Sequence, residues 1–317
     1  MSRYLRRGFC LLVLLVVAGA GPFTGKHAAY AAKSRPDVAR VTLDGTVLTV
    51  HFEGAIDAKP RQAVLDWIKR SARAVSVYYG RFPLRTVDIV INPVVGRGVR
   101  TGRAFGGDQP RIYVTVGVAS TQSDYKRDWI MVHEMIHMAF PVLHDRHDWM
   151  TEGLAVYVES VARLQAGDLN EAEVWKGFVD GMKNGLPQSG DKGLDHTPSW
   201  GRTYWGGAIF CLRADLEIRK RTSGKRSLQD ALRAVISAGG DNRARWPLIK
   251  ALEIADKATG TTAMTDLYNA WRATPVDPGL NKLWQRLGVK DLGRTVAFDN
   301  SASLAKTRRK IGARADH

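Results

Sequence analysis

Residues 129–157, WIMVHEMIHMAFPVLHDRHDWMTEGLAVY, form the stretch that decides the fold class of this chain. His133 and His137 are four residues apart, which places both imidazoles on one face of a helix, one turn apart. At that spacing their nitrogens can converge on one Zn²⁺, and Glu134 can act as a general base beside it. The expected buried stripe of this helix consists of Trp129, Val132, Ile136 and Phe140. Buried imidazoles and carboxylates are costly unless they are paired or metal-bound.

A third metal ligand is expected at Glu152. The link from 141 to 147 is short, so the helix that starts near Trp149 is an antiparallel neighbour of the histidine helix and can turn Glu152 toward the pair. Two imidazoles and one carboxylate with an open fourth position are typical of catalytic zinc. His144 follows His137 by seven residues, whereas the longer motif of another zinc class needs six with a glycine between. The alternative role for Glu152 is that of an acid favoured by the helix dipole.

Upstream of this stretch the sequence alternates strand and helix patterns. Asp44-Gly45 is a strong turn signal for a hairpin. The elements expected before residue 120 are hairpin strands over 40–43 and 46–52, a helix over 61–79, strands over 87–91 and 111–116, and a Gly-rich loop over 96–107.

Downstream the patterns are helical. Thr121 with Asp124 predicts a helix start, and Pro141 ends a helix expected to run from 121 to 140. Further helices are expected over 149–164, 171–182, 204–220, 228–237, 246–258, 262–271 and 280–287, with a short one near 301–311. The order predicts an α+β fold, in which a small mixed sheet packs on a mainly helical C-terminal half with a zinc cleft between them.

The N-terminus has the features of an export signal. Three arginines precede an apolar run over 9–20, which is shorter than the ~20 residues of a membrane span. Ala29-Tyr30-Ala31 has the form of a cleavage site, and an uncleaved N-terminal anchor is the alternative. Cys10 leaves with the leader, so only Cys211 remains and no internal disulfide forms. The protein is expected to be periplasmic or secreted.

The expected organisation is a signal peptide (1–31), an α/β part (32–120) and a helical zinc-binding part (121–300) of one catalytic domain, and a basic C-terminal tail (301–317). The formal charge is +16 and the sequence pI about 10.0. That excess suits anionic envelope polymers, lipid head groups or nucleic acid. No nucleic-acid-binding motif is visible, and no membrane span is expected after signal removal.

The motif His133-Glu134-x-x-His137 followed by Trp149-x-x-Glu152-Gly153 resembles the gluzincin zinc metallopeptidases, which have a thermolysin-like fold, and in particular the bacterial peptidase-MA-like proteins. More distantly, the segment 204–228 resembles the glycyl aminopeptidase type. Together the similarities cover roughly residues 121–235. This chain has Gly206 where that type has a lysine, a shorter link before Glu152 and no G-x-M-E-N segment.

The resemblance implies further roles. Tyr204 matches the tyrosine that donates to the oxyanion, although a packed aromatic is an equal alternative. Gluzincins bind substrate backbone along an edge strand, a part that Gly106-Gly107 and the strand over 111–116 can play; a flexible hairpin loop is the alternative. Tyr157 and Glu159 can support the ligands, with plain packing and a solvated face as their alternatives.

Two classes of function follow. The first is an exported metallopeptidase that uses one Zn²⁺ per chain, held by His133, His137 and Glu152, to hydrolyse peptide bonds with Glu134 as the general base. The second is a non-catalytic or weakly catalytic protein on the same scaffold, which binds anionic envelope polymers through its basic surface. The substrate, the oligomeric state and the choice between endopeptidase and aminopeptidase stay open.

Overall fold

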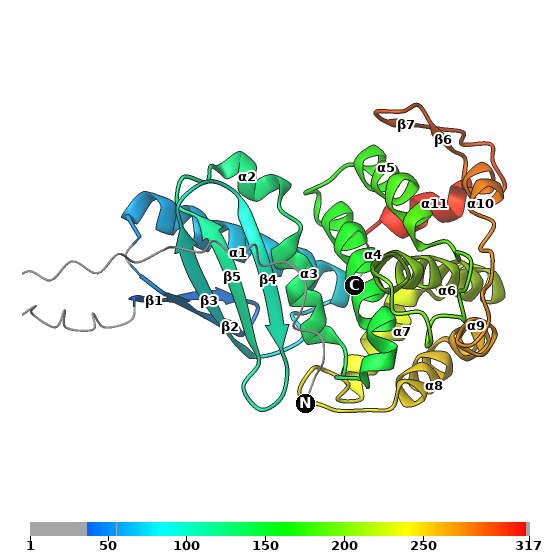
Figure 1. Cartoon of the computed structure of the whole chain (residues 1–317), viewed down its shortest axis with the longest axis horizontal. Coiled ribbons are helices and arrows are strands. Elements are labelled where there is room, and N and C mark those ends of the chain that lie inside the picture. Colours follow the sequence, from blue (N-terminus) through cyan, green and yellow to red (C-terminus); the bar gives the residue numbers. More distant parts are fainter. Residues whose placement is uncertain (1–36, 55, 315–317) are drawn as a thin grey trace, which may run out of the picture. The chain divides into compact units, whose positions relative to one another are not determined.

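A mixed five-stranded sheet opens the described part of the chain (Figure 1). The computed structural model describes residues 37–54 and 56–314, so the expected signal peptide lies outside it. The strands are β1 (Asp37–Leu43), β2 (Thr46–Phe52), β3 (Thr86–Val94), β4 (Val99–Phe105) and β5 (Arg111–Gly117), in the spatial order β1-β2-β3-β5-β4. The outer pairs β1/β2 and β4/β5 are antiparallel, and β2/β3 and β3/β5 are parallel.

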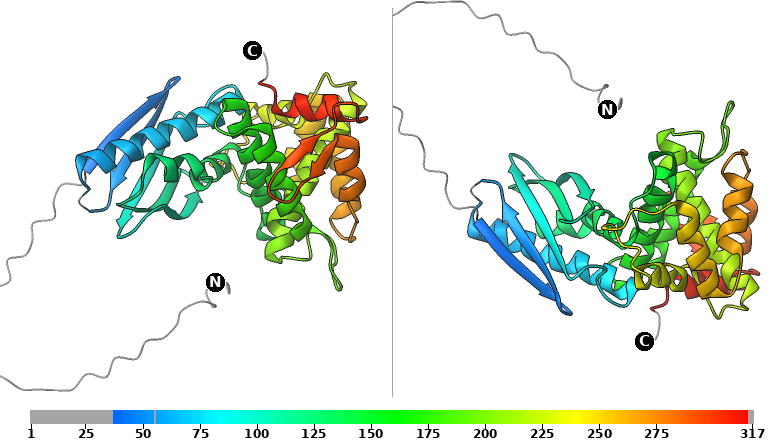
Figure 2. Two further views of the ribbon diagram at one scale, coloured as in Figure 1. Left: turned by 90° about the horizontal axis from the view of Figure 1, so that it is seen from above. Right: turned by 90° about the horizontal axis from the view of Figure 1, so that it is seen from below.

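The predicted hairpin is confirmed. Asp44 and Gly45 have φ values of 48° and 80°, which is the left-handed backbone that a two-residue turn between antiparallel strands requires. Helix α1 (Ala58–Tyr79) connects β2 to β3 and packs on the sheet, on α3 and on α4 (Figure 2). Its apolar face joins one continuous core that extends into the helical half.

The prediction of a Gly-rich loop over 96–107 is wrong, because β4 occupies most of that range. This strand pairs with β5 through its backbone, and its side chains are exposed or half-buried, so it lacks the apolar alternation that marks a strand in sequence. The strand expected over 111–116, which is β5, is therefore an interior strand and not the edge strand. β4 lies at that edge of the sheet instead.

The helical half consists of α2 (Gln122–Arg127), α3 (Ile130–Ile136), α4 (Asp148–Ala166), α5 (Glu171–Met182), α6 (Gly207–Arg221), α7 (Leu228–Ser237), α8 (Leu248–Thr259), α9 (Ala263–Trp271), α10 (Leu280–Leu287) and α11 (Ala305–Gly312). A small hairpin, β6 (Val289–Asp291) and β7 (Val296–Phe298), was not expected from the sequence. Within residues 37–54 and 56–314, no helix is both long and apolar enough to cross a membrane.

The prediction of one continuous helix over 121–140 is wrong. The Thr121–Asp124 capping box does start α2, but the chain is extended at Asp128, with ψ 137°. The Asp128 carboxylate accepts the N–H groups of Ile130 and Met131 at 3.1 Å each, so it caps a new helix. Trp129 therefore precedes α3 rather than joining its buried stripe, and it is 50% exposed.

Candidate metal centre

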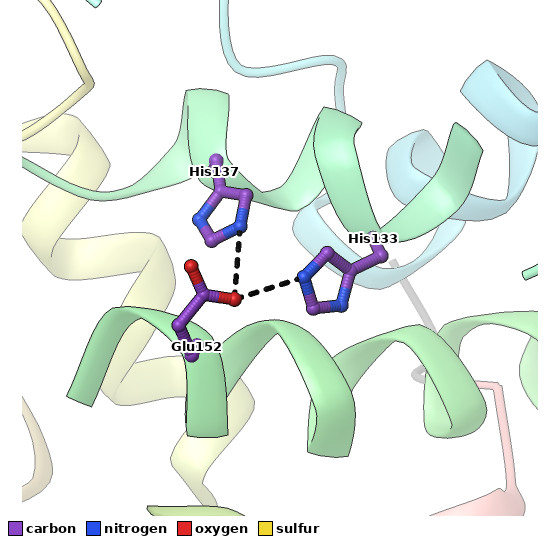
Figure 3. Close-up of side chains that lie close together, drawn as sticks. All are labelled: His133, His137 and Glu152. Carbon is purple, nitrogen blue, oxygen red and sulfur yellow. Dashed lines mark hydrogen bonds and ion pairs between the residues drawn. The ribbon is translucent and has the colours of Figure 1, made fainter. Parts of the chain in front are cut away.

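Three side chains from two neighbouring helices lie close together (Figure 3), and all three line one cleft. His133 lies on α3, His137 follows its last turn, and Glu152 lies in the first turns of α4. The Nε2 atoms of His133 and His137 are 3.1 Å and 3.6 Å from the same carboxylate oxygen of Glu152. The ligand-type atoms of all three residues lie within 4.8 Å of one another.

These residues fit a zinc ion. Ligand atoms at about 2.0–2.2 Å from a tetrahedral ion are separated from each other by roughly 3.3–3.6 Å, close to the separations that the carboxylate oxygen makes with the two imidazoles. Two imidazole nitrogens and a carboxylate oxygen are also the donors that a catalytic zinc site uses. The His133 ring is 4% exposed, so little water competes for that ligand.

The two neighbouring histidines lie outside this group, as the spacing argument expected for His144. His144 is exposed in the link between α3 and α4. His147 is buried in a separate cluster, in which its Nε2 is 3.4 Å from a carboxylate oxygen of Asp195 and 3.2 Å from the Tyr268 hydroxyl. Neither belongs to the group of ligand-type atoms around Glu152.

The protonation state of each of the three residues depends on the other two. Burial opposes ionisation of Glu152, but hydrogen bonds with His133 and His137 outweigh it and hold the pKa of this carboxyl below its usual value. Burial likewise opposes protonation of His137, yet the Glu152 carboxylate raises its pKa. Burial dominates at His133 and lowers its pKa, which favours the neutral imidazole that binds a metal.

Glu134 lies against the edge strand. Its side chain is on α3 and 8% exposed, and burial raises its pKa, an effect that the nearby backbone N–H of Ala104 on β4 partly offsets. Gly102 on the same strand makes this approach possible. A Cβ atom there would lie 2.7 Å from the Cγ of Glu134 and 2.4 Å from a methyl carbon of Ile130. The sequence analysis missed Gly102, because a glycine in a Gly-rich stretch is ordinary turn composition.

Gly102→Ala should therefore displace Glu134 without touching a metal ligand. Any turnover that depends on Glu134 should fall by about 10–10²-fold in kcat, since a shift of ~1 Å in a catalytic group has that effect. Overpacking should also lower the free energy of unfolding by about 1–3 kcal/mol. Gly177→Ala is the control, because a Cβ on that α5 glycine meets no atom within 4 Å. Equal kcat values for the two variants would contradict the packing argument.

Tyr204 faces the same group of residues. It lies on a π-helical turn, η4 (Gly201–Gly206), directly before α6, and its ring stacks on His133 with centroids 6.3 Å apart. Burial, with the carboxylates of Glu152 and Glu134 nearby, raises the pKa of Tyr204 to about 12. The phenol is therefore protonated at neutral pH and can donate a hydrogen bond.

Two glycines set the distance between Tyr204 and the ligand helix. Gly153 follows Glu152 on α4, and Gly207 starts α6. A Cβ on Gly153 would lie 2.2 Å from the backbone of Gly207, and a Cβ on Gly207 would lie 1.9 Å from the carbonyl oxygen of Trp149. The two helices thus touch through their backbones. The Glu-Gly and Gly-Gly pairs in the sequence were the available signals for this contact.

The cleft has a volume of about 780 Å³. The predicted residues that line it are His133, Glu134, His137, Glu152 and Tyr204, and the lining residues that the sequence analysis did not assign to the site include Arg100, Gly102, Arg103, Ala104, Trp129 and Asn242. Tyr157 and Glu159 point elsewhere. The Tyr157 hydroxyl donates to Asp215 at 3.0 Å, and Glu159 pairs with Arg163 at 2.5 Å, so the packing alternative holds for both.

No protein-family model matches the sequence, and no curated protein matches it. Solved structures do resemble its fold. An aminopeptidase N family protein from Idiomarina loihiensis has a TM-score of 0.58 and 13% identity, over 80% of this chain and 49% of that chain. An M1 zinc metallopeptidase from Deinococcus radiodurans has a TM-score of 0.50 and 17% identity, over 78% of this chain and 53% of that chain. This chain spans about half the length of these structures.

The chain therefore has the α+β fold of the M1 zinc metallopeptidases, a gluzincin-like fold with a mixed sheet before a helical half. A similarity at this level of identity describes the fold. The chemistry of the cleft depends on its own residues rather than on the fold.

Proposed function

We propose that this protein is an exported zinc-dependent metallopeptidase, related to the peptidase-MA-like gluzincins. The observation that carries the proposal is the convergence of His133, His137 and Glu152 in a cleft whose wall is an unpaired sheet edge, with Glu134 between the ligands and that edge. A metal site for structure alone needs neither a general base nor an open strand edge. The predicted leader supports export.

The edge of β4 orients the substrate. Among the described strands β4 pairs with β5 alone, so the backbone groups on its other side can pair with an extended peptide. Gly102 and Ala104 are half-buried on this strand, and both line the cleft beside Glu134. A peptide bound there has its carbonyl groups held next to the catalytic residues, which lowers the entropic part of the barrier.

When bound, a zinc ion would polarise the scissile carbonyl and acidify a nearby water. Glu134 takes the proton as the water oxygen attacks the carbonyl carbon, and it then passes the proton to the amine as the C–N bond breaks. Its raised pKa brings it closer to the value that suits a group taking and returning a proton. Tyr204 donates its phenolic hydrogen to the developing oxyanion.

A digest of a peptide mixture by the mature, zinc-loaded protein tests this proposal. Mass spectrometry should find new termini that are absent after treatment with a chelator and return when zinc is added back. If zinc binds but no peptide is cleaved, the proposal is wrong. The alternative, a scaffold that binds anionic envelope polymers through its basic surface, would then be favoured.

Tyr204→Phe should lower kcat by about 10²–10³-fold and leave KM almost unchanged, because the ground-state carbonyl uses this donor little. The ring stays, so its stacking on His133 is kept. Steady-state kinetics on one cleaved peptide measure both constants. An unaltered kcat would assign Tyr204 to packing alone, with a stability loss of about 1 kcal/mol at most.

A further inference from the structure

The β4 wall of the cleft carries two arginines that the mechanism does not use. Arg100 and Arg103 both line the cleft, and both are exposed. Their neighbours are paired, Arg97 with Asp124 at 3.0 Å and Arg111 with Asp88 at 3.8 Å. In the part of the chain that the structure describes, no ion pair joins Arg100 or Arg103 to a carboxylate. Arg103 lies over the Phe105 ring, 5.1 Å from its centroid, a contact that does not neutralise its charge, so both positive charges are available to a ligand of the cleft.

A β-bulge gives Arg100 its position. The register of β4 against β5 shifts between Val99, which pairs with Val116, and Thr101, which pairs with Thr115. Arg100 is the extra residue on the edge strand. Bulges of this kind occur beside active sites and change the direction of a side chain.

The charges are separated along the cleft. β4 runs alongside α3. A Cβ on its Gly102 would meet Ile130 at the start of that helix, and a Cβ on its Gly106 would meet Val142 beyond the end. Arg100 therefore lies toward the start of α3. Asp145 and Asp148 line the cleft on the segment that follows Val142, at the opposite part. An anionic group is attracted to one part of the cleft and repelled from the other.

We propose that the cleft selects peptides with an acidic side chain on the C-terminal side of the scissile bond, and that Arg100 and Arg103 bind that carboxylate. The inference rests on the proposed function. Antiparallel pairing is the more stable arrangement, so a peptide on β4 runs from the Gly106 end toward Arg100. Residues after the scissile bond then lie beside the arginines.

These arginines determine specificity through binding, and Arg103 also acts on Glu134, whose pKa its charge lowers against the larger effect of burial. An exposed charge pair contributes up to about fivefold in affinity. A peptide with Glu at this position should therefore have a Kd and a KM lower by about that factor per arginine than the same peptide with Gln. Its kcat should change little. The gain should shrink as the salt concentration rises.

Peptide hydroxamates test this directly, because the hydroxamate binds zinc and fixes the position of the peptide. In one series a succinyl hydroxamate precedes the peptide, so the variable residue lies on the C-terminal side of the metal. In the other the hydroxamate is at the peptide's C-terminus, so the residue lies on the N-terminal side. Calorimetry on the zinc-loaded full chain gives Kd for Glu, Gln and Lys at each position, without any turnover.

Glu should be preferred over Gln in the first series only. Arg100→Gln and Arg103→Gln should each reduce the preference, and the double variant should abolish it. Arg40→Gln is the matched control, since Arg40 is exposed on β1, at the other edge of the sheet. Equal Kd values for Glu and Gln, a preference in the second series, or the same loss in the Arg40 variant would overturn the inference. Hydroxamates that fail to bind at all would instead overturn the zinc site on which it rests.

Discussion

Glu134→Gln should retain one zinc per chain and lose about 10²–10⁴-fold in kcat. Glutamine has almost the same shape as glutamate, so it keeps the packing against Gly102. It cannot take a proton, however, and the general base is the group that removes the proton of the attacking water. Elemental analysis gives the zinc content, and turnover of a cleaved peptide gives kcat.

The matched control for this variant is Glu253→Gln, which makes the same chemical change at an exposed position of α8. It should leave kcat at the parental value. If Glu134→Gln also cleaves peptides at the parental rate, Glu134 is a structural acid and the mechanism proposed above is wrong.

His137→Ala should remove zinc. The remaining ligands are His133 and Glu152, and two ligands bind the ion far more weakly than three. Even the loss of a hydrogen-bonding partner of a zinc ligand costs about 10–100-fold in affinity, so loss of a ligand should exceed that factor. We expect the zinc content after dialysis to fall from one per chain to nearly none, with activity lost in parallel. Glu152→Gln, which removes the ligand's charge and keeps its shape, should weaken zinc binding with the fold intact.

His144→Ala is the control for this experiment, because His144 is exposed in the link that follows and lies outside the ligand group. Its zinc content should equal that of the parent. An unchanged zinc content in His137→Ala would exclude this residue as a ligand. Circular dichroism should show the same helix content in His137→Ala as in the parent, since Glu152 still has a hydrogen bond with His133.

The apolar periodicity of the sequence predicted most helices. The prediction failed at two places where polar residues, rather than apolar spacing, determine the secondary structure. Helices α5, α7 and α10 begin and end where the apolar spacing places them. The break before α3 was missed, although Asp128 before an apolar run is a capping signal, because the run on both sides suggested one helix. Strand β4 was missed because its side chains carry little apolar signal.

The spacing of His133 and His137 determines by itself that both imidazoles share one helix face, since the helical repeat depends on the local backbone alone. The short link and the Glu-Gly pair made Glu152 the expected third member, and the structure brings its carboxylate to both imidazoles. The strand that forms the cleft wall could not be predicted from local spacing. Strand order depends on contacts between residues far apart in the chain, and only the tertiary structure makes β4 the edge. The same holds for the glycine contacts that position Glu134 and Tyr204, because a close approach of two backbones depends on both partners at once.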